Sequence, residues 1–213
     1  MLEPIIGNAG SISAKPKWLQ KLRDLCSSHG SLLLIDEVKS GFRVAKGGAQ
    51  QLYGIYADLT TFAKAMGNGY PVAAFGGRAD VMDSIGNHSG GVVHGGTYTG
   101  NLVALRAATV CLDVITNTPA LKRADDAGSK CMQLLSRVFN KHSVPHTFAG
   151  PPAMFGIHLG KQGVPVTYET PPFLQCIIVT IKQVQGLEED HERSVCVVGV
   201  EADSPRGYAG AGQ

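Results

Sequence analysis

The stretch Leu32-Leu33-Leu34-Ile35-Asp36 is an apolar run that ends in a carboxylate. A second run, Leu59-Thr60-Thr61-Phe62-Ala63-Lys64, ends in an amine. Both runs have the length and composition of short buried strands, and a helical pattern over residues 16–29 precedes the first. This alternation predicts an α/β domain, in which ligands bind beside the carboxyl ends of the strands. Asp36 and Lys64 are therefore candidate site residues.

A carboxylate and an amine at neighbouring strand ends can act on one cofactor ring. A buried carboxylate at Asp36 needs a cationic partner, and a protonated pyridine nitrogen would be one. The ring would then act as an electron sink for a substrate carbanion. A partly desolvated amine at Lys64 would suit Schiff-base chemistry. Position alone also allows a helix cap or salt bridge at Asp36, and it favours an ordinary solvent-exposed lysine at Lys64.

The remaining elements follow from periodicity and from breaker residues. A third strand is expected at 72–77, which forms a hairpin around Lys64, and residues 39–57 are expected to be irregular because of Gly41, Gly47 and Gly48. Apolar positions at helical spacing, including Trp18, predict one buried face on the helix over residues 16–29. Further helices are predicted at 78–85, 101–115 and 119–142, and further strands at 146–149, 154–159, 176–181 and 195–200.

The change of pattern near Pro145 predicts two domains. Residues 1–144 would be part of a cofactor-binding large domain, and residues 145–213 part of a small C-terminal domain. The small, glycine-rich residues at the very end of the chain predict a disordered tail.

Composition excludes several classes of function. The net charge of +2 and the absence of basic runs argue against nucleic acid and membrane surfaces as partners. No apolar stretch is long enough to span a bilayer, and no secretory signal is visible. The five scattered cysteines fit a reducing compartment, so we expect a cytoplasmic location, with an organellar address left open in case the N-terminus is incomplete.

Motif searches narrow the chemistry further. The seven histidines show no metal-ligand spacing, so no metal site is expected, and His94 and His158 are expected to be structural or at the surface. Neither a zinc-protease nor a nucleophile-elbow motif occurs. A nucleotide-binding Rossmann domain fits the alternation of strands and helices but lacks the phosphate-binding fingerprint, so it ranks last.

Three motifs follow one another along the chain: Leu34-Ile35-Asp36-Glu37-Val38, then Phe62-Ala63-Lys64-Ala65-Met66-Gly67-Asn68-Gly69-Tyr70-Pro71, then Gly96-Thr97-Tyr98-Thr99-Gly100-Asn101. Together they resemble the signatures of class III pyridoxal-phosphate-dependent aminotransferases. The stretches Glu3-Pro4-Ile5-Ile6-Gly7-Asn8 and Gly41-Phe42-Arg43 are most similar to members of the glutamate-1-semialdehyde 2,1-aminomutase type. The resemblance covers residues 2–160.

The resemblance implies a fold, a cofactor and roles for residues. The fold would be part of the large domain of PLP-transferase fold type I, a mixed, mostly parallel sheet with flanking helices, plus an incomplete small α+β domain. The cofactor would be pyridoxal 5'-phosphate. Its expected contacts are a Schiff base and proton shuttle at Lys64, pairing of Asp36 with the pyridine nitrogen, packing of Val38 on the ring, binding of the neighbouring subunit's phosphate by Thr97, and contacts of Asn8 near the ring and of Glu3 on the substrate side.

The implied function is amino-group transfer between small molecules, namely amino acids and keto acids or amino aldehydes, in a homodimer with a shared active site. Intramolecular transfer of the aminomutase type remains open beside transamination. From the same resemblance we expect the family's N-terminal phosphate-binding loop to be missing from residues 1–30 and the residues after 167 to diverge from the family pattern. A third possibility is therefore an inactive fragment that acts only as a dimerisation module.

Overall fold

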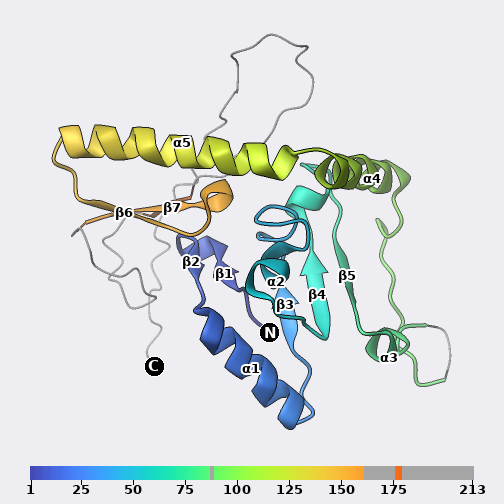
Figure 1. The fold of residues 1–213 in the computed structure, drawn as a ribbon. Coiled ribbons are helices and arrows are strands. Elements are labelled where there is room, and N and C mark those ends of the chain that lie inside the picture. The colour runs from blue at the N-terminus through green and yellow to red at the C-terminus, as the bar shows by residue number, and fades with distance from the viewer. Residues whose placement is uncertain (87–88, 161–175, 179–213) are drawn as a thin grey trace, which may run out of the picture.

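The centre of the molecule is a three-stranded sheet with the order β3-β4-β5. A computed structural model describes residues 1–86 and 89–160 and the backbone of 176–178 (Figure 1). Strand β3 (Leu34–Asp36) runs parallel to β4 (Leu59–Phe62), and β5 (Ala74–Gly77) is antiparallel to β4. An isolated parallel bridge from Leu2 to Ile35 places the N-terminal segment along the other side of β3. The predicted mixed sheet and the hairpin around Lys64 are confirmed.

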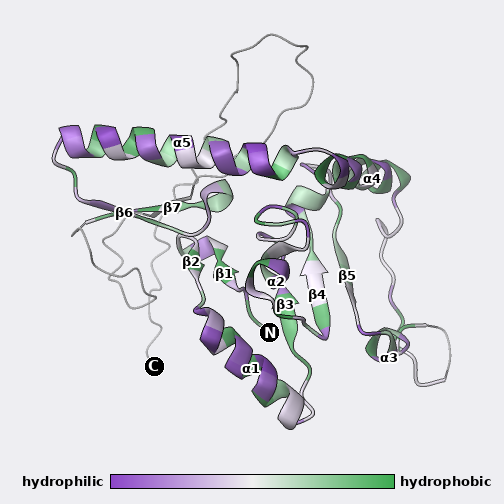
Figure 2. Ribbon diagram, viewed as in Figure 1, coloured by the Kyte–Doolittle hydropathy of each residue, from purple (hydrophilic) through white to green (hydrophobic). Residues whose placement is uncertain are grey.

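Helix α1 (Pro16–Ser28) covers the sheet where the sequence predicts a helix, with Pro16 in its first turn. Its buried stripe is narrow: Leu19, Leu22 and Cys26 pack on the core formed with Leu33, Ile35 and Ile55. Trp18 was expected on this face but is 53% exposed, because the stripe spans only positions 19, 22 and 26. In Figure 2, β3 is coloured hydrophobic, whereas most of α1 is coloured hydrophilic.

The segment between β3 and β4 contains a helix, so the prediction of irregular structure over residues 39–57 is wrong. Helix α2 (Gly48–Tyr53) begins at a glycine with a φ of +67°, a conformation that side chains of L-residues rarely adopt. The same glycine that reads as a breaker in the sequence therefore lets the chain turn into the helix. Its first amides bond to a residue twelve or more positions away, which sequence pattern does not reveal.

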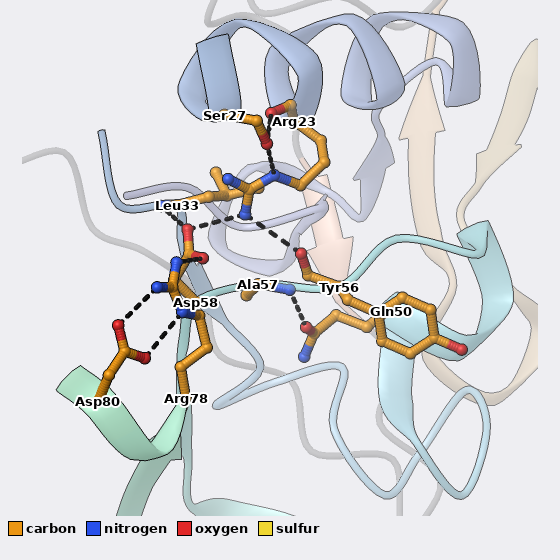
Figure 3. Close-up of polar contacts among 9 residues, drawn as sticks. All are labelled: Arg23, Ser27, Leu33, Gln50, Tyr56, Ala57, Asp58, Arg78 and Asp80. Carbon is orange, nitrogen blue, oxygen red and sulfur yellow. Dashed lines mark hydrogen bonds and ion pairs between the residues drawn. The ribbon is translucent and has the colours of Figure 1, made fainter. Parts of the chain in front are cut away.

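The amino ends of β3 and β4 are joined by the buried carboxylate of Asp58 (Figure 3). Its Oδ2 accepts hydrogen bonds from the Leu33 N–H at 2.6 Å and from Arg23 of α1 at 2.8 Å. Its Oδ1 accepts one from Arg78 at 3.0 Å, and Arg78 also pairs with Asp80. One carboxylate therefore connects α1, β3, β4 and the segment that follows β5.

The second half of the described chain has its own antiparallel sheet, made of β6 (His146–Ala149), β7 (Gly156–Leu159) and β8 (Cys176–Ile178). Phe155 and Ile157 form a core with residues of α5 (Ala120–Lys141). Helix α5 runs alongside β6 and β7 and packs against the 3₁₀ turn η3 (Pro152–Met154) (Figure 1). The strand predicted at 195–200 lies outside the described residues. The division of the chain near Pro145 stays a prediction.

The remaining elements are short or connect the two sheets. Helix α3 (Ala79–Met82) is shorter than the predicted 78–85, whereas α4 (Leu102–Asn117) closely matches its prediction. A small hairpin of β1 (Ile5–Ile6) and β2 (Ile12–Ser13), joined by the turn η1 (Gly7–Ala9), lies near the N-terminus. Ile5 packs with Ala49 and Met154, so this hairpin contacts both halves. No helix in the described part of the chain is long and apolar enough to cross a membrane.

Candidate active site

Asp36 is the last residue of β3 and lies on the opposite side of the strand from the core. Leu33, Ile35 and Glu37 are buried, while the alternate residues Leu34, Asp36 and Val38 are half-buried, as the two-residue period of a strand requires. The Asp36 N–H donates to Leu2 O at 2.8 Å, and its Oδ1 accepts the Val38 N–H at 2.9 Å. The strand end and its carboxylate are thus both held by hydrogen bonds.

Lys64 follows β4 and begins the turn η2 (Lys64–Met66). Its φ is +48°, which is uncommon for a residue other than glycine and costs on the order of 1 kcal/mol. The turn is closed by hydrogen bonds from Gly67 N and Asn68 N to Lys64 O. A Cβ at Gly67 would lie 2.8 Å from Tyr70 O, so the backbone packs closely after Lys64. The lysine side chain itself is exposed.

The register of the parallel pair brings these two residues to one edge of the sheet. Asp36 is paired with Thr61, and Lys64 comes three residues after Thr61. Parallel strands present their carboxyl ends on the same side, where ligands bind in open α/β sheets. The carboxylate and the amine predicted from the sequence therefore lie at neighbouring strand ends.

The N-terminal segment reaches the same edge through a residue that the sequence reasoning missed. Lys39 Nζ donates a hydrogen bond to Asn8 Oδ1, and the lysine stem lies over Gly7, where a Cβ would come within 2.2 Å of it. Glu3 Oε2 accepts the Gly7 N–H at 3.2 Å. Asn8 is thus bonded to the turn after Asp36, whereas Glu3 is bonded to Gly7 within its own N-terminal segment. The only sequence signal for Lys39 is its position three residues after Asp36.

Thr97 is not part of this group. It is exposed in the segment that leads into α4, and among the described residues it makes no hydrogen bond to Asp36 or Lys64. The helix after it is capped by Asn101, whose Oδ1 accepts the Ala104 N–H at 3.0 Å. Helix α4 packs against η2, the turn that begins at Lys64, so one connection between Thr97 and the site runs through α4.

Other titratable groups near the site and in the second sheet have structural contacts. Burial lowers the pKa of the Arg43 guanidinium, which lies in the turn after Asp36. His158 is buried with its Nε2 2.9 Å from Gly10 O, a structural role as expected, and the exposed His94 packs edge-on against Phe75. The described residues contain no group of three or more His, Cys, Asp or Glu side chains that could hold a metal ion.

Comparison with known proteins relates this geometry to one family. The family model for aminotransferase class-III matches residues 1–185. The match extends past residue 160, where the resemblance was expected to end, and past residue 167, after which divergence was expected, so both expectations are wrong. The glutamate-1-semialdehyde 2,1-aminomutase of Myxococcus xanthus (strain DK1622) is 44% identical over 126 residues, which is 59% of this chain and 29% of that protein.

Solved structures agree with this assignment. An omega-transaminase from Sphaerobacter thermophilus superposes with a TM-score of 0.68 at 32% identity, over 76% of this chain and 37% of its own. A beta-phenylalanine aminotransferase from Variovorax paradoxus gives 0.65 and 31% over 76% and 38%. The chain spans less than half the length of each of these relatives. With its sheet, its motifs and its family model in agreement, this chain belongs to the class III aminotransferases.

Proposed function

We propose that this chain binds pyridoxal 5'-phosphate at the carboxyl edge of β3 and β4 and takes part in amino-group transfer. The observation that carries the proposal is the parallel register that places Asp36 opposite Thr61, three residues before Lys64. A carboxylate and a primary amine at adjacent strand ends match the two ends of a pyridine aldehyde, its ring nitrogen and its carbonyl carbon.

The residues present fit the ring portion of this cofactor. Asp36 lies on the half-buried side of β3, and its carboxylate is oriented by the Val38 N–H. Lys64 has an exposed amine on a backbone held in a sparsely populated conformation, which is often found at functional sites. For the phosphate portion, this chain offers one proposed contact, Thr97. We assign Thr97 to the cofactor phosphate in the site of a neighbouring subunit.

Each residue has a distinct task in this proposal. Asp36 would keep the ring nitrogen protonated, because a carboxylate beside that nitrogen favours the charged form of the nitrogen. Lys64 would hold the cofactor through its amine and would move a proton at the substrate α-carbon. Val38 would pack on the ring, Asn8, which accepts a hydrogen bond from Lys39, would lie near the ring, and Glu3 would lie on the substrate side. When bound, the cofactor supplies an electron sink for the substrate carbanion.

The proposed assembly is a homodimer that transfers amino groups between small amino acids and keto acids or amino aldehydes. Intramolecular transfer of the aminomutase type is the alternative, supported by the 44% identity to an aminomutase. The two reactions are separated by their products. An aminomutase converts a single amino aldehyde, whereas a transaminase needs a second substrate to accept the amino group.

Covalent labelling tests the proposal. The full 213-residue chain is incubated with pyridoxal 5'-phosphate, reduced with borohydride and mapped by peptide mass spectrometry. We expect a cofactor-sized mass gain on Lys64 that disappears in Lys64→Ala. The matched control is Lys21→Ala, which removes an exposed lysine of α1 and should leave the labelling of Lys64 unchanged. Equal labelling across the exposed lysines, or none at Lys64, would contradict the proposal.

A further inference from the structure

Glu37 is a fully buried carboxylate next to Asp36, and the proposed reaction does not use it. Its residue is 0% exposed, and its side chain lies on the core side of the chain together with Ile35, opposite Asp36. A carboxylate in such a place is costly unless donors surround it. The question is therefore which donors hold Glu37 and what those hydrogen bonds fix in place.

Three donors converge on this carboxylate. Oε2 accepts the Ser40 hydroxyl at 2.5 Å and the Ala49 N–H at 3.0 Å, and Oε1 accepts the Gln50 N–H at 2.8 Å. The two amides belong to the first turn of α2, where N–H groups have no partner inside the helix. Glu37 therefore closes residues 37–50 into a loop, with α2 as its far end.

The fit around the carboxylate is close. A Cβ on Gly48 would lie 2.5–2.6 Å from the three atoms of the Glu37 carboxyl group, so Gly48 leaves room for it. At the other end of the loop, Gly41 N donates to Glu37 O at 2.8 Å, and a Cβ on Gly41 would lie 2.6 Å from that oxygen. Two glycines thus allow the backbone to wrap around one glutamate.

The same residue connects the two strands that carry the proposed site. The Glu37 N–H donates to Thr61 O at 3.0 Å, which extends the β3–β4 pairing past Asp36 toward Lys64. Val38, on the other side of Glu37, donates its N–H to the Asp36 carboxylate. A shift of the Glu37 side chain would therefore move the peptide that orients Asp36.

We propose that Glu37 is a positioning residue: by holding Ser40 and the first turn of α2, it fixes the turn that orients the Asp36 carboxylate toward the cofactor ring. This inference rests on the proposed cofactor site, and it adds a residue that acts through Asp36 rather than by touching the cofactor. It also assigns a role to Gly48, whose missing side chain leaves space for the Glu37 carboxylate.

The principal test variant is Glu37→Gln, which keeps the size of the side chain but turns one acceptor into a donor. In one orientation its NH2 group would face the Gln50 N–H, and in the other it would face the Ser40 hydroxyl and the Ala49 N–H. The first readout needs no cofactor: hydrogen exchange of the Val38 amide, whose N–H is bound by Asp36. We expect exchange at Val38 to speed up about tenfold, equivalent to roughly 1.4 kcal/mol.

The second readout is cofactor binding by the same full chain, measured as the dissociation constant of pyridoxal 5'-phosphate and as the pH profile of its visible absorbance. Glu37→Gln should weaken binding about tenfold and shift the pH profile, since Asp36 would no longer be held against the ring nitrogen. Gly48→Ala, whose Cβ would displace the carboxylate while keeping its charge, should change both readouts in the same direction.

The matched control is Asp58→Asn, which removes a second buried carboxylate at the opposite end of the same two strands. It should lower stability but leave Val38 exchange and the absorbance profile of the folded chain unchanged. Ser40→Ala removes one of the three donors and serves as a second variant if Glu37→Gln does not fold. It should change Val38 exchange and cofactor binding in the same direction as Glu37→Gln, but by less.

Exchange at Val38 that is unchanged in all three loop variants, or that rises equally in Asp58→Asn, overturns the positioning role. If the wild-type chain binds no cofactor, the proposed function fails, while the exchange readout still decides the inference about Glu37. If the wild-type chain binds and Glu37→Gln binds equally well with the same pH profile, the proposed function stands and the positioning role is overturned.

Discussion

Asp58 accepts three hydrogen bonds at the amino ends of β3 and β4 (Figure 3). Burial alone would raise the pKa of its carboxyl group. The Leu33 N–H and the guanidinium groups of Arg23 and Arg78 outweigh burial and lower the pKa to about 2. The ionised form is therefore the one that the folded chain stabilises, far from the proposed chemistry at the other end of the strands.

This lowered pKa predicts an acid-sensitive contribution to stability. A carboxyl group whose pKa is about 2 in the folded state, against an ordinary 3.8, stabilises the fold above pH 4. That contribution is lost as the pH falls from 4 to 2, because the unfolded chain binds the proton first. After allowing for solvent screening we expect a loss on the order of 1 kcal/mol.

Urea denaturation at several pH values checks this expectation. Between pH 4 and pH 2 the wild-type chain should lose more unfolding free energy than Asp58→Asn, which has no proton to bind at this position. An exposed carboxylate provides the control: Asp125→Asn on the surface of α5 should follow the wild-type curve. Parallel curves for the wild type and Asp58→Asn would contradict the assignment.

Single residues differ in how far the sequence reveals them. The places of Asp36 and Lys64 at neighbouring strand ends were predictable, because each ends an apolar run within a recognisable motif. Glu37 carries a weaker signal, the two-residue alternation that places it on the same side as Leu33 and Ile35. Its hydrogen bonds to Ala49 and Gln50 span twelve and thirteen residues, and those of Asp58 span more. Such contacts depend on the tertiary fold, so no local pattern predicts them.

Helix α5 packs on η3 through a glycine. A Cβ on Gly128 would lie 2.1 Å from Pro152 O, a backbone atom that cannot turn aside. Gly128→Ala should gain about 1 kcal/mol in helix propensity. The forced separation of α5 from η3 should cost roughly 1–3 kcal/mol, as overpacking in other cores does. Because the clash involves a backbone atom, we expect the packing cost to exceed the gain in helix propensity, so the melting temperature should fall.

Thermal unfolding followed by circular dichroism measures that balance. Asp125→Ala is the matched control, since it adds an alanine at an exposed position of the same helix and should not lower the melting temperature. A Gly128→Ala chain as stable as the wild type would show that α5 and η3 separate at little cost.

Long elements were more predictable than short ones. Helices α1, α4 and α5 begin and end within two residues of their predicted bounds, because sustained periodicity marks them. Helix α2 was missed: it has six residues and begins at a glycine, and the buried Glu37 supplies the acceptor for its first amides. Beyond Met82 the chain continues in turns, such as the one closed by the hydrogen bond from Ile85 N to Met82 O, and α3 itself buries no residue.

Within the described part of the molecule, helix α4 carries apolar residues on two sides. Ala104 and Ala108 are buried against the rest of the chain, yet Leu102 and Val103 on the outer side are 82% and 64% exposed. A helix that is hydrophobic on more than one side is normally covered on each of them. Single exposed apolar residues are common, but Leu102 and Val103 are exposed side by side on one helix that carries few charged residues.

The outer side of α4 therefore predicts association of the chain. Thr97 lies five residues before Leu102, so contact through α4 would bring Thr97 to a subunit interface, as its proposed role in a neighbouring site requires. Sedimentation velocity over a range of concentrations should show dimers for the wild type and monomers for the double variant Leu102→Glu/Val103→Glu. The control is Val138→Glu, a similar change at an exposed apolar residue of α5, which should leave the dimer intact. A monomeric wild type, or a dimer that survives both α4 substitutions, would separate Thr97 from any shared site and confine the proposed chemistry to Asp36 and Lys64 of a single chain.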